Sequence, residues 1–399
     1  MQLQADAFSA PDPDLAGRTI LQIVPDLHSG GAERTTIEVA EALAQAGARC
    51  LVASRGGRMV SELQSKGGVW LPFPAATKNP VAMALNSVRL ARIIRDEGVE
   101  IVHARSRAPA WVAHFAARQA SVRFVTTWHS TYSGSSAIKR HYNSIMAAGD
   151  IVIANSRFSA QRIADLYPAG ADRIVIIPRG ADLRRFSPAQ VEPRRVEALR
   201  AAWRIEPHRR IVLLPARLTP RKGHVVAIEA ARLLARQGLA DARFVFIGDT
   251  QSESFRETLE EMIDKAGLRD VVTLPGHCAD MPAAYLAAAV VLMPSTEPEA
   301  FGRVAIEAQA MGAPVIVADL GAASEIVRCA ADGVPQDATG WRAPAGDASA
   351  LADAIAEALA LKASARDELT RRARDHVARR FSTEQMCRAT LDVYRRLLA

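Results

Sequence analysis

Two carboxylates eight positions apart are the side chains best suited to chemistry. Glu299 lies in a loop with two prolines and a second glutamate, and Glu307 lies about five residues into the helix expected to begin near Gly302. The positive dipole of a helix N-terminus tolerates an anion such as Glu299. Carboxylates accept hydrogen bonds from sugar and ribose hydroxyls. Ordinary charges at a helix N-terminus would account for only one of the two glutamates, so the pair predicts a hydroxyl-binding site.

Two cations five positions apart form a second candidate site. Arg217 and Lys222 lie in the loop 215–223 (PARLTPRKG), which follows an apolar run and leads into a helical pattern. Both can reach a diphosphate, and each such contact near 4 Å is worth about 4 kcal/mol at an effective dielectric of about 20, before desolvation is subtracted. A solvated basic loop remains the alternative.

A glycine pair marks a third candidate site. The run Ser29-Gly30-Gly31-Ala32-Glu33-Arg34 lies between the first expected strand and the first expected helix. Two glycines let the backbone approach a ligand closely, and the free N–H groups of a helix start bind anions. The run is not G-x-G-x-x-G, so the usual dinucleotide fingerprint is absent, and a plain tight turn remains the alternative.

Short apolar or β-branched runs alternate with helical patterns along the chain. Apolar residues spaced by three and four predict the helices. Strict alternation implies right-handed crossovers and parallel sheets, with ligands outside the carboxyl ends of the strands. We therefore expect an α/β fold of two Rossmann-like domains facing each other across a cleft. The expected strands are 19–24, 49–53, 69–73, 100–103, 122–127, 150–154 and 173–177, then 211–215, 243–247, 271–274, 290–293 and 314–317.

The length of 399 residues suits two domains. We expect a disordered tail over 1–17, an acceptor-side domain over 18–180 and a Pro- and Arg-rich linker over 181–210. A nucleotide-sugar-binding domain would follow over 211–378, and a final helix over 379–399 would cross back to the first domain.

Composition excludes several classes of protein. Hydrophobic residues make up 49% and charged residues 23%, which is ordinary for a globular chain. The four cysteines form no C-x-x-C pair, so neither a zinc site nor a disulfide framework is indicated. No leader pattern is visible, and the longest apolar run, 283–294, is too short to span a bilayer. The sequence predicts a cytoplasmic protein whose membrane contact is at most peripheral.

The formal charge of +7 is unevenly distributed. Residues 1–200 carry 25 Lys and Arg against 17 Asp and Glu, whereas residues 201–399 carry 25 against 26. A basic first half indicates an anionic partner, which could be nucleic acid, a membrane surface or a phosphorylated substrate. Dispersed solvated charge is the alternative.

Several motifs together resemble one enzyme family. Glu299 to Glu307 matches the E-x7-E motif of retaining glycosyltransferases of GT-B architecture, and the surrounding PSTEPEAFGRVAIEAQAMGAPVI resembles the donor-site signature of glycosyltransferase family 4. The loop 215–223 resembles its diphosphate-binding R-x4-K. The segment 103–107 (HARSR), with Pro109 and Trp111, is similar to lipopolysaccharide-core transferases. The resemblance covers nearly the whole chain from about residue 18 and includes Gly30, Gly31, His129, Asn155, Ser156 and IPRGAD at 177–182.

The resemblance implies roles for the matching residues. Arg217 and Lys222 would hold the diphosphate of the nucleotide-sugar donor, Glu299 would contact the transferred sugar, and Glu307 would bind the ribose. His129 would approach the sugar from the first domain, unless it is a buried structural histidine. The implied catalytic residues are thus His129, Arg217, Lys222 and Glu299. Further donor contacts are implied at Gly30, Gly31, Gly276, His277, Phe301, Gly302 and Arg303, and acceptor contacts at Arg105, Arg107 and Trp128.

The implied activity is transfer of a hexose, with retention, from a UDP- or GDP-sugar. The acceptor would be an anionic glycolipid or glycan, such as a lipopolysaccharide-core or polysaccharide precursor, at the cytoplasmic face of the inner membrane. The only D-x-D motif, Asp12-Pro13-Asp14, falls in the expected tail, so no metal and no cofactor are expected. No residue stands out as a glycosidase-type nucleophile, which favours front-face attack with the leaving phosphate oxygen accepting the acceptor's proton.

Two other functions remain open. A nucleotide-sugar epimerase shares the twin-Rossmann architecture. The basic first half would also suit a protein that binds nucleic acid or a membrane surface. The absence of an aromatic-rich basic strand argues against nucleic acid.

Overall fold

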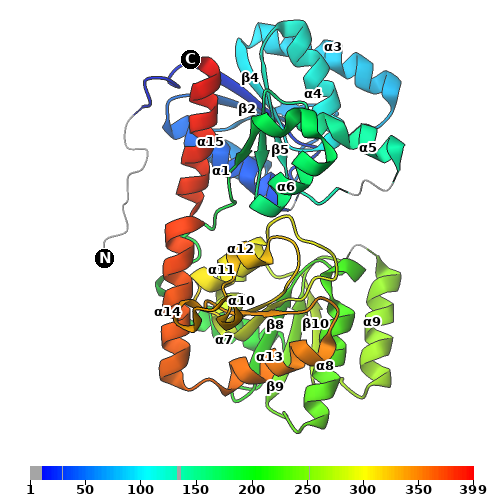
Figure 1. The fold of residues 1–399 in the computed structure, drawn as a ribbon, viewed down its shortest axis with the longest axis vertical. Helices are drawn as coiled ribbons and strands as arrows, with labels where there is room; N and C mark the ends of the chain where they lie inside the picture. Colours follow the sequence, from blue (N-terminus) through cyan, green and yellow to red (C-terminus); the bar gives the residue numbers. More distant parts are fainter. Residues whose placement is uncertain (1–10, 29, 133–135, 251) are drawn as a thin grey trace. The chain divides into compact units, whose positions relative to one another are not determined.

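The computed structural model describes residues 11–28, 30–132, 136–250 and 252–399 (Figure 1). The chain divides into two compact units. The first comprises Met1–Arg179 and Thr383–Ala399, and the second comprises Gly180–Ser382. Among the described residues, no helix is both long and apolar enough to cross a membrane.

The first unit contains a parallel sheet of seven strands in the order β3-β2-β1-β4-β5-β6-β7. Every strand expected in the first half is confirmed, within one residue at each end. Most side chains of these strands are apolar on both faces of the sheet, because helices cover both faces, as in other all-parallel sheets. The strands are β1 Thr19–Ile23, β2 Arg49–Ser54, β3 Val69–Pro72, β4 Val99–Ala104, β5 Arg123–Trp128, β6 Ile151–Ala154 and β7 Ile174–Ile176.

Two apolar cores lie on opposite faces of this sheet. Side chains alternate along β1, so Leu21 and Ile23 enter one core and Ile20 enters the other. Helices α3 and α4 belong to the first core, whereas α1 and α15 pack together over the second (Figure 1). The helices of the unit are α1 Gly31–Gln45, α2 Val60–Ser65, α3 Pro80–Asp96, α4 Arg107–Ala120, α5 Ala137–Ser144, α6 Arg157–Leu166 and α15 Thr383–Leu398.

The prediction of a disordered tail over 1–17 is wrong for residues 11–17. Leu15 is completely buried in the core beneath α1 and α15. Arg395 of α15 donates a hydrogen bond to Asp12, with 2.8 Å between Nε and Oδ2. The acidic, proline-containing composition gave no sign that Leu15 is buried. It also gave no sign that Asp12 pairs with Arg395, because that partner lies on the distant helix α15.

The second unit contains a parallel sheet of six strands in the order β10-β9-β8-β11-β12-β13. The five strands expected in the second half are confirmed within two residues at each end. The edge strand β13 was missed because it has three residues, one of them charged. The strands are β8 Arg210–Pro215, β9 Ala242–Ile247, β10 Val272–Gly276, β11 Ala288–Met293, β12 Val315–Ala318 and β13 Trp341–Ala343.

The predicted linker over 181–210 belongs to the second unit, which corrects that expectation. Ala181, Phe186, Trp203 and Ile205 are buried in the same core as β8 and β11. The segment contains helix α7 and leads directly into strand β8. It is also joined to this unit by the pairing of Ala181 with Ser382. The helices are α7 Pro193–Ala202, α8 His224–Arg236, α9 Glu253–Lys265, α10 Met281–Ala287, α11 Arg303–Ala310, α12 Ala323–Ile326, α13 Ala348–Ala360 and α14 Ala363–Arg380.

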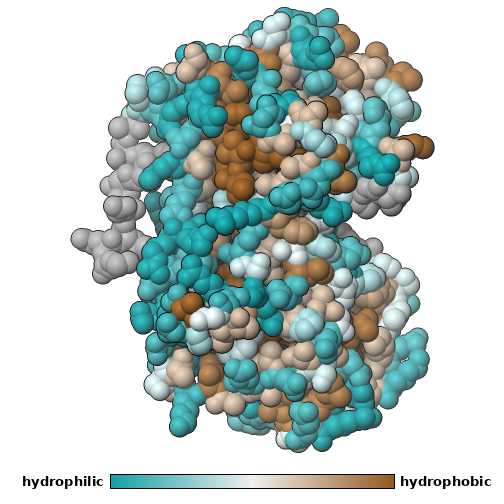
Figure 2. All heavy atoms as spheres, viewed as in Figure 1, coloured by the Kyte–Doolittle hydropathy of each residue, from teal (hydrophilic) through white to brown (hydrophobic). Residues whose placement is uncertain are grey.

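Three large apolar side chains are exposed on helix α3 of the first unit. Val81, Leu85 and Val88 of α3 are 70%, 67% and 54% exposed, and their spacing puts them on one face of the helix. Figure 2 shows brown apolar atoms among teal hydrophilic ones on this part of the surface.

Candidate active site

The two motifs of the second unit follow β8 and β11, the neighbouring strands between which the order of strands in the sheet reverses. The order β10-β9-β8 runs one way from β8, and β11-β12-β13 runs the other way. Ligands of open α/β sheets bind at such a switch point, outside the carboxyl ends of the strands. The loop 215–223 follows β8, and the loop with Glu299 follows β11. The topology therefore brings the cations and the carboxylates of distant motifs to one edge.

Gly223 holds the two loops together. Its φ of +76° is left-handed, and a Cβ at this position would lie 1.9 Å from the carbonyl oxygen of Pro294. The backbone N–H of Thr296 donates to the carbonyl of Arg221 at 2.9 Å. Only glycine permits this close approach, which brings the neighbouring Lys222 to the β11 loop.

Glu299 is the centre of a hydrogen-bonded cluster. Lys222 Nζ donates to its Oε1 at 2.5 Å, and Ser295 Oγ donates to the same atom at 2.7 Å. Arg221 Nη2 lies 3.6 Å from Oε2. Burial alone would raise the pKa of Glu299, but Lys222, Arg221 and the hydrogen bonds outweigh burial, so its pKa lies below the ordinary value. Glu299 is therefore ionised at neutral pH.

Glu307 is held by two partners on the second unit. Tyr285 of α10 donates its hydroxyl to Oε2 at 3.1 Å, and Arg303 Nε donates to Oε1 at 3.2 Å. Burial, and then the nearby Glu307, raises the pKa of Tyr285, which keeps its hydroxyl protonated. Sequence reasoning missed Tyr285 because it lies in an apolar run that reads as core. It also missed Ser295, which carries no signal beyond its place after β11.

The other predicted residues of the second unit differ in their surroundings. Arg217 is exposed and has no hydrogen bond or ion pair within the described residues. His277 Nδ1 lies 2.9 Å from Asp249 Oδ1, next to Gly276, whose φ is +86°. The side chain of Phe301 is buried against Phe381, so only its backbone could meet a ligand. Gly302, with a φ of +126°, immediately precedes α11.

The glycine pair of the first unit follows β1, which lies beside β4 at the switch point of the first sheet. Gly30 has a φ of +139°, and a Cβ there would lie 2.4 Å from a carboxylate oxygen of Glu33. Gly31 begins α1. The preceding Ser29 lies outside the described residues. The carboxylate of Glu33 thus lies at the helix start where an anionic ligand was expected.

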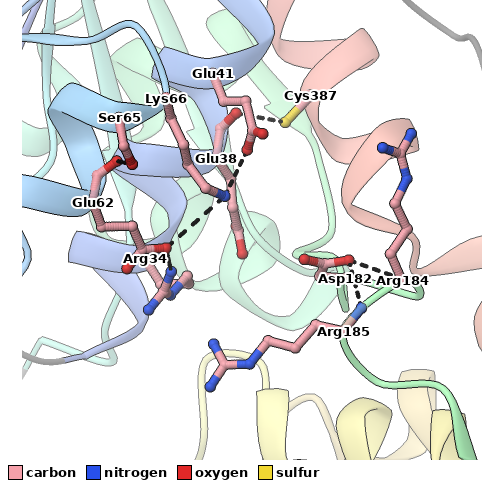
Figure 3. A network of polar contacts seen from close by, with 10 residues as sticks. All are labelled: Arg34, Glu38, Glu41, Glu62, Ser65, Lys66, Asp182, Arg184, Arg185 and Cys387. Atoms are coloured by element: carbon pink, nitrogen blue, oxygen red, sulfur yellow. Dashed lines mark hydrogen bonds and ion pairs between the residues drawn. The ribbon is translucent and has the colours of Figure 1, made fainter. Parts of the chain in front are cut away.

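Arg34, the last residue of that run, belongs to a polar network on α1 and α2. It is paired with Glu62, while Lys66 Nζ donates to Glu41 at 2.7 Å (Figure 3). This cation is therefore neutralised within its own unit.

Figure 3 also shows Asp182 of the second unit, whose carboxylate accepts hydrogen bonds from the backbone N–H groups of Arg184 and Arg185 at 2.9 and 3.1 Å.

His129 follows β5 and is bound by Arg179 of the IPRGAD segment at 177–182, a residue to which the sequence analysis gave no role. Arg179 Nη2 lies 2.5 Å from His129 Nδ1 and 3.4 Å from its carbonyl oxygen. Burial, followed by the charges of Arg179 and Arg105, keeps the pKa of His129 well below its ordinary value. His129 is therefore a neutral imidazole.

The structure argues against two of the three predicted acceptor contacts. Arg105 is 3% exposed, and its Nε donates to Gln22 Oε1 at 2.8 Å inside the core. Trp128 is 1% exposed and packs against Tyr132, with 4.8 Å between the ring centroids. Both side chains are buried because helices cover both faces of this sheet. Arg107 remains half-buried, hydrogen-bonded to Asn143 at 2.9 Å and stacked 4.5 Å from the ring centre of Tyr132.

In the described parts of the chain, no group of three or more His, Cys, Asp or Glu side chains is placed to hold a metal ion. In the Asp12-Pro13-Asp14 motif, Asp12 forms an ion pair with Arg395.

Comparison with known proteins identifies the family. Residues 195–376 match the family described as glycosyl transferases group 1, and residues 29–185 match glycosyltransferase family 4. A crystal structure of a glycosyltransferase from Rickettsia africae is 34% identical, covers 96% of this chain and 99% of that one, and superposes with a TM-score of 0.86. The chain belongs to glycosyltransferase family 4. The GT-B fold class expected for this family 4 chain is confirmed, with two parallel Rossmann-like sheets.

Two further known proteins are similar to this chain in sequence or in fold. The D-inositol 3-phosphate glycosyltransferase of Saccharomonospora viridis is 32% identical over 262 residues, which cover 64% of this chain and 57% of that protein. This family 4 chain thus spans about half the length of the curated relatives that it matches. HepE of Anabaena, solved with UDP and glucose, is 22% identical, covers 94% of this chain and 99% of its own, and has a TM-score of 0.80.

Proposed function

We propose that the protein is a retaining glycosyltransferase that moves a hexose from a UDP- or GDP-sugar to an anionic glycolipid or glycan. The observation that carries the proposal is the Lys222–Glu299 pair at the switch point of the second sheet. A sugar diphosphate needs a cation for its phosphates and a hydroxyl acceptor for its sugar, side by side. This pair supplies both.

Nucleotide-sugar binding would use the second unit. Diphosphate oxygens compete with Glu299 for Lys222, and the unpaired Arg217 supplies a second cation. Glu299, released from Lys222, accepts hydrogen bonds from the sugar hydroxyls. Glu307, oriented by Tyr285, accepts those of the ribose. The backbone near Gly276 and His277 would contact the base. HepE of Anabaena, which has a similar fold and was solved with UDP and glucose, supports the proposal of a UDP-sugar donor.

The chemistry follows from the charge that develops during transfer. The bond between the anomeric carbon and the β-phosphate oxygen breaks, and a bond from the acceptor oxygen to that carbon forms on the same face. The acceptor's proton passes to the leaving phosphate oxygen. Negative charge therefore grows on the diphosphate, where preorganised cations such as Lys222 and Arg217 stabilise the transition state most.

The acceptor is proposed to be anionic because the cations are concentrated in the first half of the chain. The relatives named for inositol 3-phosphate act on a phosphorylated acceptor, which supports this charge class. A lipopolysaccharide-core or polysaccharide precursor is the more specific proposal, based on the HARSR segment at 103–107.

We also propose peripheral contact between the first unit and the inner membrane. Val81, Leu85 and Val88 lie exposed on α3, and Ile138 of α5 is 84% exposed. Trp111 of α4 donates to the carbonyl of Tyr142 at 3.1 Å, which joins α4 to α5. Among the residues of α3, α4 and α5, Asp96 is the only acidic one, whereas seven are Lys or Arg. Apolar side chains surrounded by cations suit an anionic lipid surface.

The central experiment offers UDP-, GDP- and ADP-sugars to the protein in a thermal-shift screen, then mixes the stabilising donor with glycolipid extracts. Mass spectrometry should show one added hexose, and NMR should show a retained anomeric configuration. Release of nucleotide without an acceptor, with a changed sugar, would favour the epimerase. Binding to plain duplex or RNA with a steep salt dependence, without sugar transfer, would favour a nucleic-acid protein.

A further inference from the structure

Arg179 contacts both the ring and the backbone of His129 at the carboxyl edge of the first sheet. His129 follows β5 and Arg179 follows β7, so the guanidinium reaches past the end of β6, the strand between them. Its Nη2 lies 2.5 Å from His129 Nδ1 and 3.4 Å from the carbonyl oxygen of the same residue. One cation thus fixes the imidazole relative to its own backbone.

The contact determines which nitrogen of the imidazole carries the proton. A guanidinium has only N–H donors and stays charged at any pH at which proteins fold. The Nδ1 atom that it meets must therefore offer a lone pair, and a neutral imidazole then holds its proton on Nε2. A proton on Nδ1 would face an N–H group of the same sign.

The other nitrogen has no partner in the part of the chain that the structure describes. His129 Nε2 is buried and makes no hydrogen bond to any described residue. Buried N–H groups are nearly always paired in folded proteins. An Nε2–H group without a protein acceptor indicates that a ligand oxygen accepts its hydrogen bond.

We propose that Arg179 is a positioning residue that holds His129 as the neutral Nε2–H tautomer, so that His129 donates a hydrogen bond to a hydroxyl of the transferred sugar and does not act as a general base. The identity of the ligand rests on the proposed function, whereas the tautomer rests on the geometry alone. Burial disfavours an imidazolium most, followed by the charges of Arg179 and Arg105, which face the ring.

The tautomer can be measured without any substrate. In protein labelled with 15N at histidine, long-range correlation spectra distinguish protonated from unprotonated ring nitrogens, and the His129→Gln spectrum identifies the signals of His129. We expect an unprotonated Nδ1 and a protonated Nε2 in the unaltered protein. Arg179→Met should give a mixture of tautomers and a higher His129 pKa. A protonated Nδ1 in the unaltered protein, or an unchanged tautomer in Arg179→Met, would overturn the proposal.

Matched variants separate positioning from folding. Arg123→Met removes an exposed cation at the start of β5, the strand that leads to His129, and should leave the tautomer unchanged. Arg179→Lys keeps a hydrogen-bond donor and tests rescue of the tautomer. If Arg179→Met is unstable, the pair Arg179→Lys and Arg179→Gln provides the same comparison.

The transfer assay then tests the role of the tautomer. Arg179→Met should lower kcat/KM for the nucleotide sugar about five- to tenfold at neutral pH, the effect of one hydrogen bond. The acid limb of its pH profile should move to higher pH, because the imidazolium forms more readily. An unshifted profile would contradict the role of Arg179. Complete absence of transfer in the unaltered protein, with the expected tautomer, would instead contradict the proposed function.

Discussion

Lys222 and Glu299 form an ion pair of 2.5 Å between Nζ and Oε1, although 77 positions separate them in the chain. Their side chains are only 19% and 13% exposed. Each partner neutralises the other before any ligand arrives. The pair therefore keeps the carboxylate proposed to bind the sugar and the cation proposed to bind the phosphates at hydrogen-bonding distance.

Replacing Lys222 by Met should lower kcat about 100-fold, because one preorganised charge on the leaving group is lost. Steady-state transfer kinetics measure the effect, and thermal unfolding checks the fold. Lys265→Met is the matched control, since Lys265 pairs with Glu261 on the exposed face of α9. Equal loss of activity in both variants would show that the loss is not specific to the site.

Replacing Glu307 by Ala should weaken binding of the nucleoside diphosphate about 10- to 100-fold, the range for a hydrogen bond to a charged group. The kcat at saturating nucleotide sugar should change much less, because the ribose does not react. Tyr285→Phe, which removes only the orienting hydroxyl, should have a smaller effect. Calorimetry measures both, with the exposed Glu357→Ala as control. Unaltered affinity in Glu307→Ala would rule out the ribose contact.

The Lys222–Glu299 pair should stabilise the fold only above acidic pH. The pKa of Glu299 is lower in the folded protein than its ordinary value of 4.5, so its ionised form favours folding above about pH 4.5. That contribution is lost as the pH falls through the folded pKa. The difference in unfolding free energy between the unaltered protein and Glu299→Gln, from urea titrations, should shrink over this range. A difference that stayed constant there would contradict the pKa, and the exposed Glu261→Gln should show little difference at any pH.

Leu85→Glu should weaken binding to anionic vesicles about fivefold or more, because it removes an apolar contact and adds a repelled charge on α3. Co-sedimentation with phosphatidylglycerol vesicles measures the effect, and phosphatidylcholine vesicles show how much of the binding depends on charge. Val334→Glu alters an exposed apolar residue of the second unit and should bind like the unaltered protein. Equal binding by both variants would exclude α3 as the contact.

Leu15→Ala should reduce the free energy of unfolding by about 2–4 kcal/mol, the range for a buried leucine. The residue lies in the segment that composition marks as a tail, yet its side chain is fully buried. Urea unfolding measures the change. The exposed Val81→Ala should stay within about 0.5 kcal/mol of the unaltered protein. Similar changes in unfolding free energy for the two variants would show that residues 11–17 contribute no more to stability than a tail would.

Several features were readable from the sequence because they depend on local order. Apolar runs bounded by glycines and polar residues predicted all strands except β13, whose Trp341, Arg342 and Ala343 are too few for a pattern. The segment 181–210 was misread as a linker, because its prolines and arginines conceal Phe186 and Trp203, which enter the core of the second unit. Periodicity indicates an element but not what it packs against.

The site shows the same division. The sequence by itself determined which residue types lie after β8 and β11, since spacing along the chain fixes them to strand ends and helix starts. Only the tertiary structure decided that Lys222 meets Glu299, that Tyr285 holds Glu307, that Arg179 meets His129 and that Arg105 turns inward to Gln22. The physical reason is that such contacts depend on strand order and on close approaches, such as Gly223 against Pro294, which arise only when distant segments pack together.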